Sequence, residues 1–556
     1  MWFRTSAFLI VLLGAIAPGF AAETKAYDLL IRNARILDGT GNPWFLGDVG
    51  VRDGRIAAVG RALAGTADEI VDAGGNYLSP GFIDLHSHAD DAFDPESGLR
   101  SQDALRRAAP NLVSQGITTV VVNQDGRSPL PIATQRDRLE ELGTGPNAVL
   151  LVGHGSIRQR VLGADFRREA TEAEIQRMRE LIRQGMEEGA LGLSVGLEYA
   201  PGKWSATDEL IQCVREIVPF DGVLISHQRS EGADPVWFWP SRDDSTRAPS
   251  LLDSVAETIE IGEKTGATVV ASHIKAKGVR YWGASQAVVQ MVERARVRGV
   301  RIWADQYPYE STGSDGNIVL IPPWAFRVGF DGYANAVEQI LQDPVRAKEL
   351  HRDIAHEIER RGGAARIFII ESSDESFVGK SLQELADARG VEPVETAILL
   401  QREGFPDLPG GARLRGFSLS AIDLKTYARQ PWTATSSDAG IALPEDSMVH
   451  ARFYGAFPRT IRLFALDHAV LAPADAIRGM TSLPAMILGL SDRGIIRKGA
   501  AADLVLLDLS RLRDEATFSE PHRYASGILY VWVNGDAVVR KGSLTRALPG
   551  RVLRRK

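Results

Sequence analysis

The chain is poor in cysteine and carries no strong charge of either sign. Cys213 is the only cysteine among 556 residues, which excludes an internal disulfide. The net charge of −7 comes with no basic stripe and no long run of like charge, so nucleic acid is not an expected partner. Internal repeats and low-complexity tracts are missing as well. What remains is an ordinary globular composition, 44% hydrophobic and 24% charged, in a chain long enough for more than one domain.

Long apolar runs are also missing, apart from one at the N-terminus. Arg4 precedes the apolar run 7–17, and Gly19-Phe20-Ala21 offers a small-x-small cleavage site. This pattern predicts a secretory signal peptide over residues 1–21, with an uncleaved anchor as the alternative. We therefore expect an exported chain with no stable membrane insertion after signal cleavage. An exported bacterial protein without disulfides is expected in the periplasm or secreted.

Short alternating strands are predicted at both ends of the chain. They cover 27–36, 47–51 and 55–59 near the start, and 502–508, 527–533 and 537–540 near the end. Turn pairs such as Asp53-Gly54 and Asn534-Gly535 separate neighbouring strands. The simplest account is one small β-sandwich built from residues 22–79 and 490–556.

Between these ends, apolar runs of β-forming residues alternate with amphipathic helical segments. Eight runs are predicted as strands: 81–85, 118–122, 149–152, 191–195, 222–226, 268–272, 301–304 and 432–436. Helices are predicted between most of them, for example over 172–188, 254–264 and 285–298. Eight such units predict an α/β fold with a (β/α)8 TIM-like barrel over residues 80–489. Residues 325–415 interrupt the alternation, and we expect an inserted subdomain there.

The first barrel strand ends in a pair of histidines. The stretch PGFIDLHSHAD at 80–90 leads an apolar run into His86 and His88. Because residues i and i+2 of a strand point to the same face, these two imidazoles are expected side by side. Two neutral imidazoles on one face supply half of a metal site.

Later strands supply the missing partners. His227 ends the fifth predicted strand, His273 the sixth and Asp438 the eighth. In barrels of this kind the reactive residues lie at the carboxyl ends of the strands, so these side chains are expected to share one rim with His86 and His88. Four histidines and a late aspartate in this arrangement predict a metal centre.

Several longer motifs resemble the amidohydrolase superfamily and, within it, the D-aminoacylase (N-acyl-D-amino-acid deacylase) family. Besides PGFIDLHSHAD, the two later histidines and SSDAG at 436–440, they are QGITTVVV at 115–122, GLSVGLEYAPG at 192–202, YPY at 307–309, HARFYGAFPR at 450–459 and MTSLPAMILGLSDRGIIRKGAAADLVLLD at 480–508. The resemblance covers nearly the whole chain after the signal segment, and the motifs follow one another in the family's order.

The resemblance implies a metal-dependent deacylase that holds one or two zinc ions, with other divalent metals as alternatives. Its substrate would be a small molecule, an N-acyl-D-amino acid, hydrolysed to a carboxylate and a free amine, with D preferred over L. The residues suit this chemistry, because zinc lowers the pKa of water towards about 7 and polarises a carbonyl. Asp438 is placed to accept a proton from water and to pass it to the leaving nitrogen.

The chain departs from the family in its bridging group. After QGITTVVV the relatives carry a metal-binding cysteine, where this chain has Asp125. The fourth predicted strand also lacks the lysine that other amidohydrolases use as a bridge, and Glu198 stands near the end of that segment. A carboxylate can bridge two cations, so Asp125 and Glu198 remain alternative bridging ligands.

Other side chains are candidates for binding the substrate. Lys275 and Arg452 could pair with its α-carboxylate, and the resemblance favours Arg452, whose fork can bind a carboxylate in bidentate fashion. Tyr307 follows the seventh strand and could donate to the scissile carbonyl. His154 is interpreted as structural or supporting, and His450 as a residue that lines the pocket.

Two other functions remain open. One is an amidohydrolase that acts on cyclic amides, or on dipeptides with D-residues or isopeptide bonds. The other is an exported binding protein that has kept the fold and lost catalysis, which the four histidines and Asp438 argue against.

Overall fold

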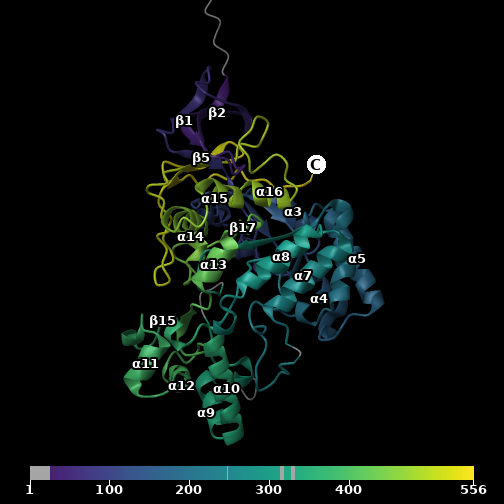
Figure 1. Ribbon diagram of the computed structural model, residues 1–556, viewed down its shortest axis with the longest axis vertical. Helices are drawn as coiled ribbons and strands as arrows, with labels where there is room; N and C mark the ends of the chain where they lie inside the picture. Colours follow the sequence, from purple (N-terminus) through teal and green to yellow (C-terminus); the bar gives the residue numbers. More distant parts are fainter. Residues whose placement is uncertain (1–25, 247, 314–317, 327–331, 556) are drawn as a thin grey trace, which may run out of the picture.

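The computed structural model describes residues 26–246, 248–313, 318–326 and 332–555. The predicted signal segment 1–21 lies outside these residues. Figure 1 shows three parts along the long axis: a sheet formed by the two chain ends at the top, a barrel in the middle and a mostly helical insert at the bottom. Within the described residues, no helix combines the length and the apolar character that crossing a bilayer would require.

The two ends of the chain meet in one nine-stranded sheet. Strand β5 (Tyr77–Pro80) pairs with β1 (Tyr27–Ile36) on one side and antiparallel with β19 (Leu504–Leu507) on the other. Alternate side chains of these strands fill a core of their own, which includes Ile31 and Leu504. The remaining strands are β2 (Phe45–Arg52), β3 (Arg55–Gly60), β4 (Ala67–Asp72), β20 (Ile528–Val533), β21 (Asp536–Arg540) and β22 (Ser543–Leu544).

The middle of the chain forms eight parallel strands in sequence order. They are largely buried, and most are rich in apolar residues, as is typical of a sheet covered on both faces. They are β6 (Phe82–Asp84), β8 (Ile117–Val122), β9 with β10 (Asn147–Leu150 and Val152–Gly153), β11 (Gly192–Gly196), β12 (Val223–His227), β13 (Thr268–Ala271), β14 (Ile302–Gln306) and β17 (Thr433–Thr435). The ring closes where β7 (Ser87–His88) pairs with β18 (Ala439–Gly440). All strands therefore end on one rim.

Helices surround the barrel and follow its strands. They include α3 (Ile132–Leu142), α4 (His154–Leu162), α5 (Glu172–Glu187), α6 (Thr207–Arg215), α7 (Leu251–Thr265), α8 (Ser285–Val297), α13 (Ala421–Ala428), α15 (Pro473–Met480) and α16 (Ser482–Ile487). Their starts obey local rules: Thr171 and Ser250 form capping boxes ahead of α5 and α7. Helix α14 (Arg452–Arg459), which follows β18, carries Arg452 at its first position.

The insert between β14 and β17 has its own hydrophobic core. Four helices pack on a short antiparallel pair of strands, and residues such as Leu350, Ile367 and Leu414 are buried between them. The elements are α9 (Tyr333–Leu341), α10 (Pro344–Arg360), β15 (Ile367–Glu371), α11 (Leu382–Arg389), α12 (Pro393–Glu403) and β16 (Arg413–Gly416). Figure 1 places the insert on the opposite side of the barrel from the sheet of the chain ends.

Candidate metal centre

The predicted histidines meet at the carboxyl rim of the barrel. His227 is the last residue of β12, His273 lies two residues past β13, and His86 and His88 follow β6. His86, His227 and His273 are buried, whereas a third of the His88 side chain is exposed. The strand ends thus bring together side chains from distant parts of the sequence, as the barrel rule predicts.

Asp125 stands at the centre of these rings. One carboxylate oxygen, Oδ1, lies 3.3 Å from His227 Nδ1, 3.6 Å from His86 Nε2 and 3.8 Å from His273 Nε2. The other, Oδ2, lies 3.7 Å from His88 Nε2. Four ring nitrogens therefore face one carboxylate at distances that leave room for a cation between them.

The backbone at this rim adopts a conformation that side chains other than glycine rarely take. Asp125, His273 and Asp438 all have positive φ angles, of 57°, 34° and 50°. Such residues store strain that the surrounding packing must hold, and they concentrate at functional sites. Three of them beside one another mark this rim as the chemically specialised part of the fold.

Each buried histidine has a partner on the ring nitrogen that faces away from Asp125. His86 Nδ1 lies 2.7 Å from Ser272 Oγ, and His227 Nε2 lies 3.2 Å from Glu198 Oε2. His273 Nδ1 lies 2.9 Å from Lys275 Nζ and 3.2 Å from Glu231 Oε1. The hydrogen bonds of His86 and His227 fix the tautomer and leave the inner nitrogen free to bind a metal, as is usual for metal-binding histidines.

The residues present fit a divalent metal. Among the described residues, Asp125 Oδ1 and His227 Nδ1 are buried without a hydrogen-bond partner. Burying such polar atoms costs free energy unless a ligand binds them. Three groups have ligand atoms within 4.8 Å of one another: His86, Asp125 and His273; His86, His88 and Asp438; and His227, Glu231 and His273. Imidazoles with carboxylates are a donor set that suits zinc.

The electrostatics of the centre also favour a cation. Burial raises the pKa of Asp125, but His227 and the other histidines outweigh burial and hold it well below its usual range. Burial lowers the pKa of His227, but Asp125 and Glu198 outweigh burial and raise it to about 10. The carboxylates thus attract positive charge to this point, which a proton or a metal can supply.

Glu198 and Asp125 occupy different places in the site. Glu198 Oε2 contacts the outer nitrogen of His227, while its Oε1 accepts a hydrogen bond from the backbone N–H of Val236 at 2.7 Å. Asp125 contacts inner nitrogens of all four histidines. Of the two bridging candidates from the sequence, Asp125 thus lies among the inner ring nitrogens, whereas Glu198 contacts the outer nitrogen of His227.

Asp438 lies beside the His86–His88 pair. Its Oδ1 is 3.2 Å from His88 Nε2, and its Oδ2 accepts a hydrogen bond from Arg452 Nη1 at 2.7 Å. Burial raises the pKa of Asp438, but Arg452 and the nearby histidines outweigh burial and hold it well below its usual range. The carboxylate is thus ionised and able to accept a proton.

The candidate substrate residues line the same cavity. Lys275 Nζ lies 2.5 Å from Glu231 Oε1, and the Arg452 guanidinium carbon lies 4.8 Å from the centre of the Tyr307 ring. The cavity has a volume of about 530 Å³, and its lining includes Asp438, the candidate substrate residues and all the predicted metal ligands except the fully buried His86. The structure therefore assembles the predicted residues in one place.

Two predicted histidines do not belong to the cavity wall. His154 is the first residue of α4, and its Nε2 lies 2.9 Å from Glu209 Oε1. Both side chains are buried, so His154 has a supporting role. His450 is not among the residues that line the cavity, so the expectation that it does so is wrong. It is buried behind Arg452, where its Nδ1 accepts the Arg452 backbone N–H and its Nε2 lies 2.6 Å from Ser311 Oγ.

Sequence reasoning missed six charged or aromatic groups of the cavity wall. They are Asp91, Arg127, Tyr199, Glu231, Lys277 and Arg361. His273, Lys275 and Lys277 occupy alternate positions in the sequence. Because Lys275 was already a candidate, this spacing could have identified Lys277 as another. The position of Arg361 gives no such signal, since it depends on how the insert docks on the barrel.

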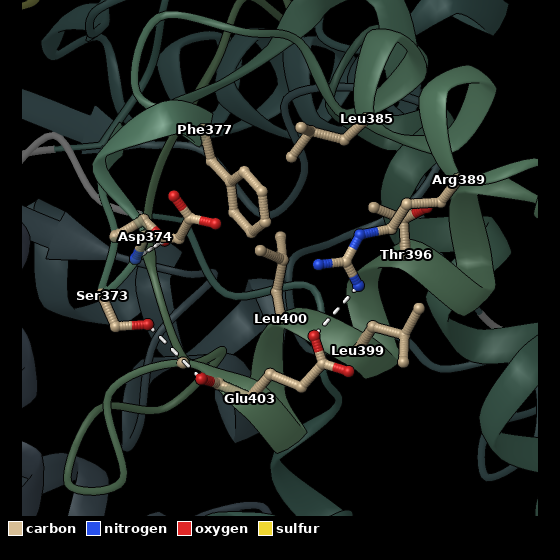
Figure 2. Close-up of a pocket in the computed structure, with 11 residues that line it drawn as sticks. Ser373, Asp374, Phe377, Leu385, Arg389, Thr396, Leu399, Leu400 and Glu403 are labelled. Carbon is tan, nitrogen blue, oxygen red and sulfur yellow. Dashed lines mark hydrogen bonds and ion pairs between the residues drawn. The ribbon is translucent and has the colours of Figure 1, made fainter.

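A separate cavity of about 170 Å³ lies within the insert (Figure 2). Figure 2 shows apolar side chains such as Phe377 and Leu400 beside an ion pair, in which Arg389 Nη1 lies 3.0 Å from Glu403 Oε2. It shares no lining residue with the barrel cavity. The candidate active site is therefore the barrel cavity.

Comparison with known proteins agrees with this site. The sequence model of the Amidohydrolase family matches residues 69–210 and 360–539. N-acyl-D-glutamate deacylase of Alcaligenes xylosoxydans xylosoxydans is 31% identical over 95% of this chain and 96% of its own length. D-aminoacylase of the same organism is 30% identical over 96% of this chain and 99% of its own length.

A solved structure is similar over almost the whole chain. N-acyl-D-glutamate deacylase of Bordetella bronchiseptica was crystallised with zinc and a phosphonate inhibitor that mimics the tetrahedral intermediate. It superposes with a TM-score of 0.71 at 29% identity, over 95% of this chain and 100% of its own. The predicted fold class is thereby confirmed. With a family model over more than half of its length and relatives aligned almost from end to end, the chain belongs to the amidohydrolase family.

Proposed function

We propose that this protein hydrolyses the amide bond of N-acyl-D-amino acids, with zinc as the metal, to give a carboxylate and a free D-amino acid. The observation that carries the proposal is the convergence of four histidines on Asp125, with Asp438 beside them, on the rim of the barrel. Relatives named for this activity are about 30% identical over almost the whole chain, and one binds zinc.

The metal would be held by His86, His88, Asp125, His227 and His273. When bound, a divalent metal polarises an amide carbonyl and lowers the pKa of water. Glu198 holds the outer nitrogen of His227, and Lys275 and Glu231 contact the outer nitrogen of His273. The inner nitrogens therefore keep their orientation toward the centre.

Asp438 moves the proton. As an ionised carboxylate it accepts a proton from the attacking water and returns it to the leaving nitrogen, which departs as an amine. Arg452 fixes its orientation, because the hydrogen bond to Oδ2 leaves Oδ1 turned toward His88. Arg452 and Lys275 also place positive charge in the cavity wall for the substrate's α-carboxylate, and Tyr307 stays the candidate donor to the scissile carbonyl.

A substrate panel with metal analysis of the same sample tests the proposal. It compares N-acetyl-D-amino acids with their L-enantiomers, hydantoins and dipeptides. We expect turnover of the D-series, a clear preference over the L-series, and one or two equivalents of zinc. Turnover of hydantoins or dipeptides alone would replace the proposed function, and a metal-loaded protein without turnover of any amide would make it a binding protein.

We also propose that the mature protein is exported to the periplasm or beyond. The support is the apolar run 7–17 after Arg4 and the single cysteine. Fractionation of the native host with N-terminal sequencing of the mature chain tests this. An intact Met1 in a cytosolic fraction would contradict it.

A further inference from the structure

The residues that line the active-site cavity are almost all charged, polar or aromatic. Val236 is the one aliphatic side chain among the described residues that line it, and the rest are charged, polar or aromatic apart from a glycine. Pockets that select an apolar side chain are lined mainly by apolar groups. This lining therefore offers few aliphatic contacts to a leucine-like or methionine-like side chain.

Of the five carboxylates that line the cavity, Asp91 accepts hydrogen bonds from backbone N–H groups, and the other four are engaged by side chains of the site. Asp125 faces the four histidines, and Asp438 accepts from Arg452. Glu231 uses Oε1 for Lys275, at 2.5 Å, and for His273. Glu198 is held between His227 and the backbone of Val236. Little negative charge is left to neutralise further cations in the wall.

Two largely buried cations of the wall, Lys277 and Arg361, are only partly neutralised by such partners. Lys277 is 6% exposed, and its ion pair with Glu231 is loose, since Nζ lies 3.5 Å from Oε2 and makes no hydrogen bond to the described residues. Arg361 donates through Nε to Glu357 at 2.6 Å, and its terminal nitrogens make no hydrogen bond to the described residues. Glu357 is shared with Arg360.

Lys277 and Arg361 also repel each other. Burial lowers the pKa of Lys277, Glu231 partly offsets this effect, and the neighbouring Arg361 adds to it. Glu231 also pairs with Lys275, and Glu357 also pairs with Arg360, so one carboxylate serves two cations in each case. A bound anion would supply the charge and the hydrogen-bond acceptors that this sharing leaves missing. The two side chains therefore offer positive charge to an anion, one from the loop after β13 and the other from the end of α10 in the insert.

We propose that Lys277 and Arg361 bind a second carboxylate, carried by the side chain of the substrate, so that the enzyme acts on N-acyl derivatives of acidic D-amino acids. The inference rests on the proposed function, in which Lys275 and Arg452 take the α-carboxylate. Overall identity does not decide it, because the D-glutamate enzyme and the D-aminoacylase are 31% and 30% identical to this chain. The insert then has a role in selecting the substrate.

Two substrates that differ only in the side-chain charge test whether the enzyme recognises a second carboxylate. N-acetyl-D-glutamate and N-acetyl-D-glutamine have nearly the same shape and differ by one charge. We expect wild-type kcat/KM to be at least about tenfold higher for the glutamate, the scale of a charged hydrogen bond. Lys277→Met and Arg361→Gln should each lower this glutamate-to-glutamine ratio about tenfold. Lys264→Met and Arg298→Gln, which remove exposed cations on the barrel surface, are the matched controls and should leave the ratio unchanged.

The outcomes separate the inference from the proposed function. No turnover of any N-acyl-D-amino acid by the zinc-loaded wild type would contradict both the inference and the proposed function. Efficient turnover of N-acetyl-D-leucine or N-acetyl-D-glutamine, at or above the rate for the glutamate, would overturn the inference alone. An equal loss on both substrates in Lys277→Met would also overturn it, because Lys277 would then bind the α-carboxylate. Circular dichroism and zinc content establish that each variant is folded and loaded.

Discussion

Arg452 is hydrogen-bonded to Asp438, with Nη1 2.7 Å from Oδ2. Both side chains are buried, and Arg452 is the first residue of α14, so the helix start holds the guanidinium in place. His450 supports this start by accepting the Arg452 backbone N–H. The candidate anchor for the substrate carboxylate is thus in direct contact with the candidate base, and the two functions cannot be altered independently.

Loss of Arg452 should therefore affect both kinetic constants. A residue that only anchors the α-carboxylate equally in ground and transition states would raise KM and leave kcat unchanged. Because Arg452 also orients Asp438, we expect Arg452→Ala to raise KM and to lower kcat at least about tenfold. Steady-state kinetics on the best N-acyl-D-amino acid measure both. A rise in KM with unchanged kcat would show that the contact with Asp438 does not matter for turnover.

Removal of the proton acceptor should abolish most of the activity and keep the metal. Asp438→Asn has nearly the same shape but cannot accept a proton, and we expect turnover to fall at least about a hundredfold, the usual scale for a general base. Asp125, His227 and His273 are left intact, so zinc should still bind. The variant is assayed for kcat and for zinc content. Rates near those of the wild type would mean that Asp438 is not the base.

The histidines and Asp438 could be found from the sequence because each follows a recognisable strand. The parallel barrel places all strand ends on one rim, so sequence order alone brings His86, His227 and His273 together. Asp125 was identified through the resemblance, since it occupies the place of a cysteine. Its competition with Glu198 could not be settled, because which ring nitrogen of His227 each carboxylate meets depends on side-chain packing.

Residues whose position relative to the cavity depends on tertiary contacts could not be predicted from the sequence. Arg361 reaches the cavity because α10 docks on the loop after β12, where Arg360 donates to the backbone carbonyls of Pro235 and Val236. These contacts join segments more than a hundred residues apart, without any motif to mark them. His450 was misplaced for a similar reason, because the turn into α14 buries it behind Arg452 rather than toward the cavity.

The anchor of the insert should depend on pH through Glu357. Burial raises the pKa of this carboxyl group, but Arg360 and Arg361 outweigh burial and lower it to about 2. A lowered carboxyl pKa contributes stability above the unfolded-state value near 4.5, and this contribution is lost as pH falls toward 2. We expect Glu357→Gln to reduce the free energy of unfolding by about 3 kcal/mol at pH 7, and by less at pH 3.5.

Urea denaturation followed by tryptophan fluorescence, at both pH values, measures this difference. Glu260→Gln, which breaks an exposed pair with Lys264, is the control and should change the free energy of unfolding by no more than about 0.5 kcal/mol. A difference between wild type and Glu357→Gln that stays the same at pH 7 and pH 3.5 would exclude the ion-pair explanation.

Single substitutions of Asp125 and Glu198 should have different effects on metal binding. Asp125 contacts the inner nitrogens of four histidines, and two cations held close together need an anion between them. We expect Asp125→Ala to bind less than half of the zinc of the wild type, even with zinc in excess. Among the four histidines, Glu198 contacts only His227, at its outer nitrogen, so Glu198→Ala should weaken zinc affinity about 10- to 100-fold but reach the full stoichiometry at saturation. Zinc titration by calorimetry, with metal analysis after gel filtration, distinguishes the two. A full complement of tightly bound zinc in Asp125→Ala, or a loss of stoichiometry confined to Glu198→Ala, would reverse the assignment of the bridging carboxylate.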